Sequence, residues 1–218
     1  MKTNSENKSA IRTPQSAILL LGPTGSGKTP LGELLEERGL HGRRCAHFDF
    51  GDHLRRIAAG TWLPPTLSPA DIDIVTHAIQ ERMLLTDDQF YIAEGILKAF
   101  ILEKDVQTNH LIILNGMPRH AGQAQGVETL TSVIAVVELR CSPDIVLARI
   151  QKNTGGDRTE RDDDALDAVR RKLEIYEAQT APLVDHYRSL QIPVHTLKVA
   201  TDSSAIDMCA KLEQTTAL

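Results

Sequence analysis

One stretch decides the fold of this chain: Gly22-Pro23-Thr24-Gly25-Ser26-Gly27-Lys28-Thr29. It matches the phosphate-binding pattern G-x-x-x-x-G-K-[ST]. An apolar run at 17–21 precedes it and indicates a buried strand, and a helical pattern that includes Leu31 and Leu35 follows it. In this strand–loop–helix arrangement, backbone N–H groups and the helix N-terminus bind phosphate. We therefore reject a mere glycine-rich turn, and predict that Lys28 supplies a full charge and Thr29 a hydroxyl ligand for Mg²⁺.

Composition limits the remaining possibilities. The 218 residues are 41% hydrophobic and 24% charged, which is typical of a soluble globular protein. A net charge of −5 argues against generic nucleic-acid binding. No apolar run approaches the roughly 20 residues of a membrane span. We therefore expect no nucleic-acid or membrane partner, and a cytoplasmic monomer.

The cysteines and the N-terminus add little chemistry. Cys45, Cys141 and Cys209 are far apart and form no C-x-x-C pair, so we expect free thiols in a reducing compartment and no zinc site. Residues 1–14 are polar and lack the apolar segment of a signal peptide. We expect them to form a flexible tail before a single domain at 15–218.

Strands and helices alternate along the rest of the chain. After the first strand, we predict strands at 44–50, 110–114, 133–139 and 192–199. We predict helices at 51–59, 69–85, 89–106, 143–152, 164–188 (bent near Pro182) and 203–214. Such alternation favours an α/β fold, in which a parallel sheet of five strands is covered by helices on both faces.

Polar residues follow the predicted strand at 110–114. They include Asn115, Arg119 and Gln123. In open α/β folds the ligand lies beyond the carboxyl ends of the strands, so Arg119 is expected at the same edge as the phosphate loop. A guanidinium can grip phosphate there, and the Gln123 amide suits a nucleobase edge. Considered alone, a strand-to-helix turn with a solvated arginine remains an equal alternative.

Two further segments carry charge. Phe48-Asp49-Phe50-Gly51-Asp52-His53-Leu54-Arg55 follows a short strand, so Asp52 and Arg55 are expected to face the same edge. The segment 158–164 runs Arg-Thr-Glu-Arg-Asp-Asp-Asp before a helix. A solvated helix start explains its acidic end, because acidic residues there suit the helix dipole. That interpretation accounts less well for its two arginines.

In their order and spacing, these four segments resemble the adenylate kinases and related nucleoside monophosphate kinases. The resemblance covers about 16–200. It implies a three-layer P-loop NTPase fold in which a core binds ATP with Mg²⁺. A helical insert, here about 51–87, would bind the monophosphate. A short lid at about 153–163 would close over ATP, and it has no room for the zinc-bearing form.

The resemblance also implies residue roles. ATP would be bound by Gly22, Pro23, Thr24, Gly25, Ser26, Gly27, Lys28, Thr29 and, against its base, Arg149. The monophosphate would be bound by Phe50, Arg55, Arg119 and Gln123, the last reading an adenine-like base. Transfer would depend on Lys28, Arg119, Arg158 and Arg161, with Asp163, Asp164 and Lys172 completing the lid. Mg²⁺ would be held by Thr29 and, through water, by Asp52 and Asn115.

Several positions depart from the family pattern. The family usually has aspartate where this chain has Asn115, so we predict that Asn115→Asp raises activity at limiting Mg²⁺. Pro30 replaces a phosphate-binding hydroxyl, and Phe50 replaces a small residue near the monophosphate base. Lys172 replaces a second lid arginine, and Arg171 is a candidate to substitute for it.

Three functions therefore stay open. The first is an ATP-dependent nucleoside monophosphate kinase with AMP as the acceptor. The second is a small-molecule kinase on the same fold with another acceptor, favoured if Phe50 blocks a base pocket. The third is a nucleotide-binding regulator of low turnover, suggested by Pro30, Asn115 and Lys172.

Overall fold

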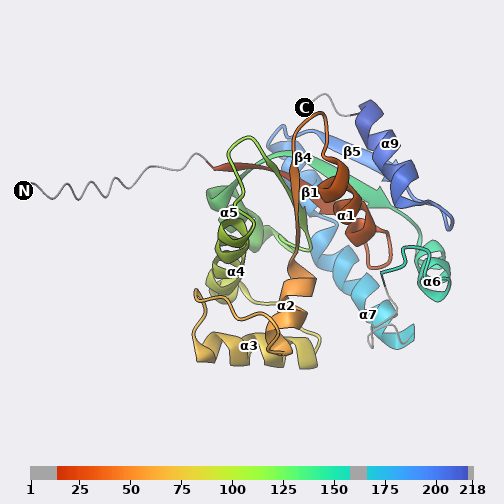
Figure 1. Cartoon of the computed structure of the whole chain (residues 1–218). Helices are drawn as coiled ribbons and strands as arrows, with labels where there is room; N and C mark the ends of the chain where they lie inside the picture. Colours follow the sequence, from red (N-terminus) through yellow and green to blue (C-terminus); the bar gives the residue numbers. More distant parts are fainter. Residues whose placement is uncertain (1–13, 158–165, 216–218) are drawn as a thin grey trace, which may run out of the picture.

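A five-stranded parallel sheet forms the centre of the protein (Figure 1). The computed structural model describes residues 14–157 and 166–215. The strand order is β2-β3-β1-β4-β5. The strands are β1 (Gln15–Leu21), β2 (Cys45–Asp49), β3 (Leu111–Asn115), β4 (Thr131–Arg140) and β5 (Val194–Lys198). The predicted α/β fold with a parallel sheet of this size is confirmed.

Helices cover both faces of the sheet. The first half of the chain contributes α1 (Lys28–Arg38), α2 (Phe50–Ala58), α3 (Pro69–Gln80), the short 3-10 helix η1 (Asp87–Gln89) and α4 (Phe90–Glu103). The second half contributes α5 (Ala121–Leu130), α6 (Pro143–Gln151), α7 (Leu166–Ile175), the π-helical turn η2 (Tyr176–Thr180), α8 (Leu183–Ser189) and α9 (Ala205–Thr215). Figure 1 shows α1 and α9 on one side of the sheet and α4 and α5 on the other.

The strand sequences create two separate cores. Successive side chains of a strand point to opposite faces, so Ile18 and Leu20 pack with α1 and α9, whereas Leu19 and Leu21 pack with α2, α4, α5 and α8. Every residue of β1 from Ala17 to Leu21 is at most 2% exposed. Because the central strand is buried on both faces, it is apolar throughout, as parallel sheets require.

Two predicted helices end earlier than expected, because a residue other than glycine stops them. The helix expected at 69–85 ends at Gln80, where Arg82 adopts a left-handed φ of 55°. The Met83 amide then donates to the Ala78 carbonyl at 2.9 Å, which closes the helix end. Asp105, with φ 45°, ends α4 at Glu103 in the same way.

The long helix expected at 164–188 is divided into α7, η2 and α8. The Ala181 amide donates to the Tyr176 carbonyl at 2.8 Å, five residues back, and Pro182 follows at once. The helix is therefore interrupted next to Pro182, where the sequence predicted a bend. Within the described ranges, no helix is both long enough and apolar enough to cross a membrane.

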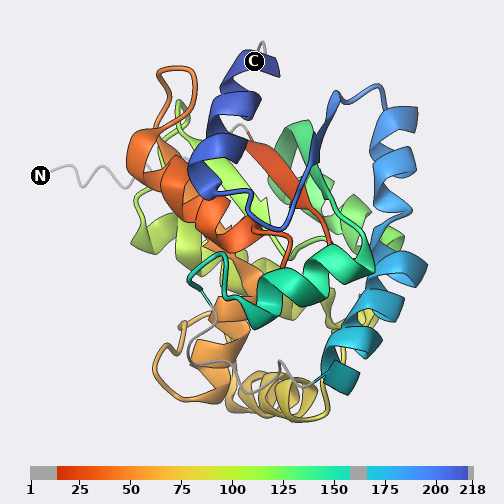
Figure 2. The ribbon, with the colours of Figure 1, turned by 90° about the vertical axis from the view of Figure 1, so that its right-hand side faces the viewer.

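The functional segments gather at one end of this architecture. Figures 1 and 2 both place α2, α3 and α7 beyond the same end of the sheet. The phosphate loop joins β1 to α1, and β2 and β3 end beside it in register. Residues 1–13 of the tail predicted at 1–14, and the lid residues Arg158, Arg161, Asp163 and Asp164, lie outside the described residues.

Candidate functional site

The phosphate loop leaves β1 and turns directly into α1. Gly27 stands at the N-cap of α1 with a left-handed φ of 99°, a conformation that other residues rarely adopt. A side chain on Gly25 would meet Ile150 of α6, at 2.8 Å from its Cγ1 atom. Two glycines of the pattern are therefore required by backbone conformation and by close packing, which supports a phosphate-binding loop over a chance turn.

Lys28 bends back over this loop. Its Nζ donates to the carbonyl oxygens of Gly22 at 2.7 Å and Pro23 at 2.9 Å. The ammonium group is thereby held at the mouth of the loop by the backbone of the loop itself. This arrangement places a full positive charge beside the helix N-terminus, where both attract an anion.

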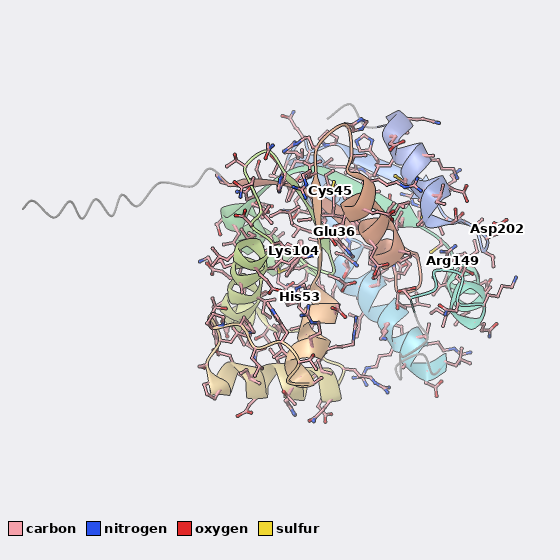
Figure 3. All side chains as sticks on the ribbon, viewed as in Figure 1. Glu36, Cys45, His53, Lys104, Arg149 and Asp202 are labelled. Atoms are coloured by element: carbon pink, nitrogen blue, oxygen red, sulfur yellow. The ribbon has the colours of Figure 1, made fainter. Side chains whose placement is uncertain are left out.

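Arg149 joins the loop to the C-terminal part of the fold (Figure 3). Its Nε donates to the Gly25 carbonyl at 3.0 Å, and its Nη1 donates to the carbonyls of Ala200 at 2.8 Å and Ser203 at 2.9 Å. The side chain is buried, and burial lowers the pKa of the guanidinium, partly offset by Cys141. Its predicted place against the ATP base stays a prediction. In this structure the guanidinium fastens the loop between β5 and α9 to the phosphate loop.

A polar cluster lies behind the loop, and we call Thr29, Asp49 and Asn115 the β2–β3 cluster. The Thr29 hydroxyl donates to Oδ2 of Asp49 at 2.7 Å. The Asn115 Nδ2 group lies 2.8 Å from the same oxygen and 3.1 Å from Thr29 Oγ1. Asp49 and Asn115 are partners in the register of β2 and β3, so the strand pairing itself brings them together.

Asp49 holds its charge within this cluster. Burial by itself raises the pKa of the carboxyl group, but hydrogen bonds from Thr29 and from the Asp52 amide, with the charges of His47 and Arg55, outweigh burial and leave the pKa below its ordinary value. Asp49 also forms the N-cap of α2, because its Oδ1 accepts the Asp52 amide at 2.9 Å. A carboxylate therefore lies at the end of β2, fixed on both oxygens.

Two arginines meet beside the cluster. A methyl group on Gly51 would lie 3.4 Å from Arg55 Nη1 and 3.5 Å from Arg119 Nη2, so both guanidinium groups reach the space over one glycine. Burial lowers the pKa of Arg119, Asp49 opposes that shift, and the like charge of Arg55 adds to it. Two cations this close favour a multiply charged anion between them. The structure thus brings together the arginines that the sequence predicted for the acceptor phosphate.

Gln123 lies behind Arg119 and is 1% exposed. Its Oε1 accepts the Arg119 amide at 2.9 Å, and its Nε2 donates to the Leu85 carbonyl at 3.2 Å. A cavity of about 280 Å³ opens next to Leu85, lined also by His120, Arg171 and Ile175. Phe50 is 2% exposed and stacks on Phe48, with 6.1 Å between ring centroids.

Comparisons with known proteins agree with this geometry. A family profile described as "AAA domain" matches residues 18–172. The adenylate kinase of Stenotrophomonas maltophilia (strain K279a) is 35% identical over 179 residues, covering 78% of this chain and 84% of the relative. The chain belongs to the adenylate kinase family. The adenylate kinase of Parvibaculum lavamentivorans is 32% identical, covering 79% of each protein. That of Xanthomonas campestris pv. campestris (strain 8004) is 31% identical, covering 78% of this chain and 84% of the relative.

Membership of the adenylate kinase family makes the chain a nucleotide-binding kinase of the P-loop class. Of the residues predicted for the loop, Gly22 to Gly27 lie between β1 and α1, and Lys28 and Thr29 lie in the first turn of α1. Of the residues predicted for the lid, Lys172 lies half-buried on α7 and the arginines fall outside the described residues. Arg171, which the sequence suggested as its substitute, borders the cavity.

The β2–β3 cluster of this adenylate kinase relative brings together residues from α1, β2 and β3. The sequence predicted roles for Thr29, Asn115 and Asp52, but none for Asp49. One signal was available, because an aspartate at the end of a strand and the start of a helix is a common N-cap. The pairing of β2 with β3 was not visible in the sequence, and neither was the hydrogen bond from Thr29 that connects Asp49 to the phosphate loop.

The donor set of this cluster fits Mg²⁺. Magnesium in nucleotide sites is bound by oxygen, through one or two carboxylates together with phosphates and water. Thr29 offers a hydroxyl and Asp49 a carboxylate at the loop. Among residues 14–157 and 166–215, no group of three His, Cys, Asp or Glu side chains is arranged to hold a metal by protein ligands alone.

Proposed function

We propose that this chain transfers the γ-phosphoryl group of ATP to a nucleoside monophosphate, with AMP as the acceptor. The observation that carries the proposal is the approach of Arg55 and Arg119 over Gly51. A kinase acting on an uncharged acceptor needs no second anion site next to the phosphate loop. A dianionic phosphate, in contrast, needs paired guanidinium groups.

The reaction follows from the distribution of charge. ATP phosphates would lie on the loop at Gly22–Thr29, with the Lys28 ammonium turning from its carbonyl partners to the phosphoryl oxygens. The acceptor phosphate would lie on Arg55 and Arg119. Cations around the transferring group offset the negative charge that spreads over its oxygens. Bound Mg²⁺ would neutralise phosphate charge beside Thr29, and we keep Arg158, Arg161, Asp163, Asp164 and Lys172 as the proposed lid residues.

AMP is the proposed acceptor because Gln123 carries an amide donor and acceptor beside Arg119. Reading of a base by Gln123 requires that its bonds to Leu85 and to the Arg119 amide be exchanged for bonds to the base. A second candidate follows from the same contacts. If those bonds persist, Gln123 only positions Arg119, and the acceptor is a phosphorylated compound without adenine.

A coupled assay with ATP and a panel of AMP, GMP, CMP, UMP and dTMP tests the proposal. We expect turnover that is fastest with AMP and is abolished by Lys28→Ala. Arg119→Ala should lower kcat/KM for the acceptor about 100-fold or more, because each donor to transferring phosphate has that scale of effect. Arg188→Ala is the matched control, since this exposed arginine pairs only with Asp185 among the described residues.

The outcomes separate the candidate functions. Turnover of AMP that Gln123→Ala reduces selectively, relative to the other monophosphates, supports base reading by Gln123. Faster turnover of another monophosphate than of AMP, with no selective effect of Gln123→Ala, favours the second candidate. Tight ATP binding with no turnover of any monophosphate contradicts the proposed nucleoside monophosphate kinase, and leaves a nucleotide-binding regulator or a kinase with an acceptor outside the panel.

A further inference from the structure

Asp49 is the carboxylate nearest the phosphate loop in the β2–β3 cluster, and no family role accounts for it. Its Oδ2 accepts both the Thr29 hydroxyl at 2.7 Å and the Asn115 amide at 2.8 Å. Thr29 directly follows the loop lysine and opens α1. A carboxylate that orients this hydroxyl acts on whatever the hydroxyl binds.

The position of Asp49 explains how the chain tolerates asparagine at 115. The resemblance to the family implies an aspartate there, at the end of β3. In this chain the negative charge stands on the neighbouring strand, at the register partner of the same residue. The Asn115 Nδ2 atom lies 2.8 Å from Asp49 Oδ2, so the carboxylate of Asp49 is one hydrogen bond away from position 115 and lies at the same edge of the sheet.

The hydrogen-bond directions add a second reason. The Thr29 hydroxyl uses its only proton on Asp49, and it accepts the Asn115 amide with one lone pair. Among the described residues these bonds leave its second lone pair for a cation. P-loop NTPases hold Mg²⁺ with the Ser or Thr of the loop and with a nearby aspartate. Thr29 and Asp49 supply that pair of groups here.

We propose that Asp49 takes the place of the aspartate missing at 115 and positions Mg²⁺·ATP, acting through Thr29 and the water shell of the ion. This inference rests on the proposed function, because the ion arrives with ATP. Asp49 is thus a positioning residue that fixes Thr29 and adds the negative charge which favours a divalent cation.

Asp52, the other acidic residue of the segment, is differently placed. Its side chain is 48% exposed and pairs with Arg55, with 3.4 Å between the charged atoms. Its backbone amide, and not its carboxylate, contacts Asp49. Asp52 thus pairs with an acceptor arginine, whereas Asp49 lies near both arginines and also accepts the Thr29 hydroxyl of the phosphate loop.

Calorimetric titration with ATP tests the assignment without any turnover. For each variant the dissociation constant of ATP is measured in EDTA and in saturating Mg²⁺, and the ratio of the two reports how strongly the ion supports ATP binding. We expect Asp49→Asn to lower this ratio about tenfold or more, the usual effect of altering a group that supports a metal site. In EDTA, ATP should bind as well as to the wild type or better, because a negative charge has been removed.

Two variants control the measurement. Asparagine is as good an N-cap as aspartate, so Asp49→Asn should keep α2 and the fold, which an unfolding curve without ATP checks. Asp71→Asn removes another carboxylate that is hydrogen-bonded at a helix start, by Ser68 at the N-cap of α3, and should leave the ratio unchanged. Asp52→Asn tests the competing assignment.

The decisive variant exchanges the two side chains. Asp49→Asn combined with Asn115→Asp returns the carboxylate to β3 and reverses the hydrogen bond between the two side chains. We therefore expect the double variant to restore most of the wild-type ratio of ATP dissociation constants in EDTA and in Mg²⁺. The inference is overturned if Asp49→Asn leaves the ratio unchanged, if the folded exchange variant recovers nothing, or if Asp52→Asn causes the larger fall. Wild-type protein that binds Mg²⁺·ATP but phosphorylates no monophosphate overturns the proposed function alone. Wild-type protein that binds no ATP overturns both.

Discussion

Asn115 donates a hydrogen bond from Nδ2 to the Oδ2 atom of Asp49 at 2.8 Å, across 66 residues of sequence. The contact joins the ends of β2 and β3 beneath the phosphate loop. It makes asparagine the better partner at this position, because an amide donates where a carboxylate can only accept. In the sequence, asparagine at 115 indicates a lost negative charge, whereas in the structure its amide is the hydrogen-bond donor that Asp49 accepts.

The first prediction concerns Asn115→Asp alone. From the sequence we expected higher activity at limiting Mg²⁺, and the structure adds an expected loss of stability. Two carboxylates would meet at the distance of a hydrogen bond, and the donor to Asp49 would be lost. We expect the variant to lose about 1–3 kcal/mol of unfolding free energy, measured by urea denaturation without nucleotide. An increase in activity at limiting Mg²⁺ with unchanged stability would support the sequence-based expectation alone.

The second prediction concerns Arg149→Ala. The change removes the donors to the carbonyls of Gly25, Ala200 and Ser203 inside the protein. Because buried acceptors without partners are costly, we expect a loss of about 2–4 kcal/mol in urea denaturation and weaker ATP binding. Arg188→Ala, on the surface, should cost less than about 1 kcal/mol. Weaker ATP binding with full stability would instead favour the predicted contact between Arg149 and the ATP base.

The third prediction concerns Gly51→Ala. The added methyl group would lie in ordinary contact with Arg55 and Arg119, at 3.4 and 3.5 Å, and would narrow the space between them. Since alanine favours helix, stability should be equal or higher by up to about 1 kcal/mol. We expect the KM for the monophosphate to rise about tenfold while the dissociation constant of ATP stays unchanged. An unchanged acceptor KM in steady-state kinetics would count against phosphate binding at this position.

The fourth prediction concerns Gly32→Ala, which has the opposite effect on stability. Here the added Cβ would overlap the imidazole of His47, because α1 packs closely on β2 at this glycine. We expect a loss of about 1–3 kcal/mol despite the higher helix propensity of alanine. Combining it with His47→Ala should recover much of that loss in the same denaturation experiment. If Gly32→Ala lowers the unfolding free energy equally with and without the His47 side chain, the close approach of residue 32 to His47 is not the cause.

The sequence alone determined the elements and the end of the sheet at which they act. The loop at Gly22–Thr29 predicted a strand before it and a helix after it, because its glycines and its lysine bind phosphate only between those two elements. Continuous apolar runs indicated buried parallel strands. The same local signals placed Arg55 and Arg119 after strands, and so at one edge.

The tertiary structure decided which of those elements are neighbours and which side chains therefore come into contact. Local sequence does not encode which strands are neighbours, so the order β2-β3-β1-β4-β5 was needed to bring Asp49 to Asn115 and Thr29. The helix ends at Arg82 and Asp105 carried no glycine signal, although local hydrogen bonds from the Met83 amide to Ala78 and from the Val106 amide to Ile101 close them. Motifs short enough to read in the sequence thus indicated a nucleotide site. The carboxylate that we propose for this site belongs to Asp49 on β2, and β2 is brought next to β3 only by pairing between residues far apart in the sequence.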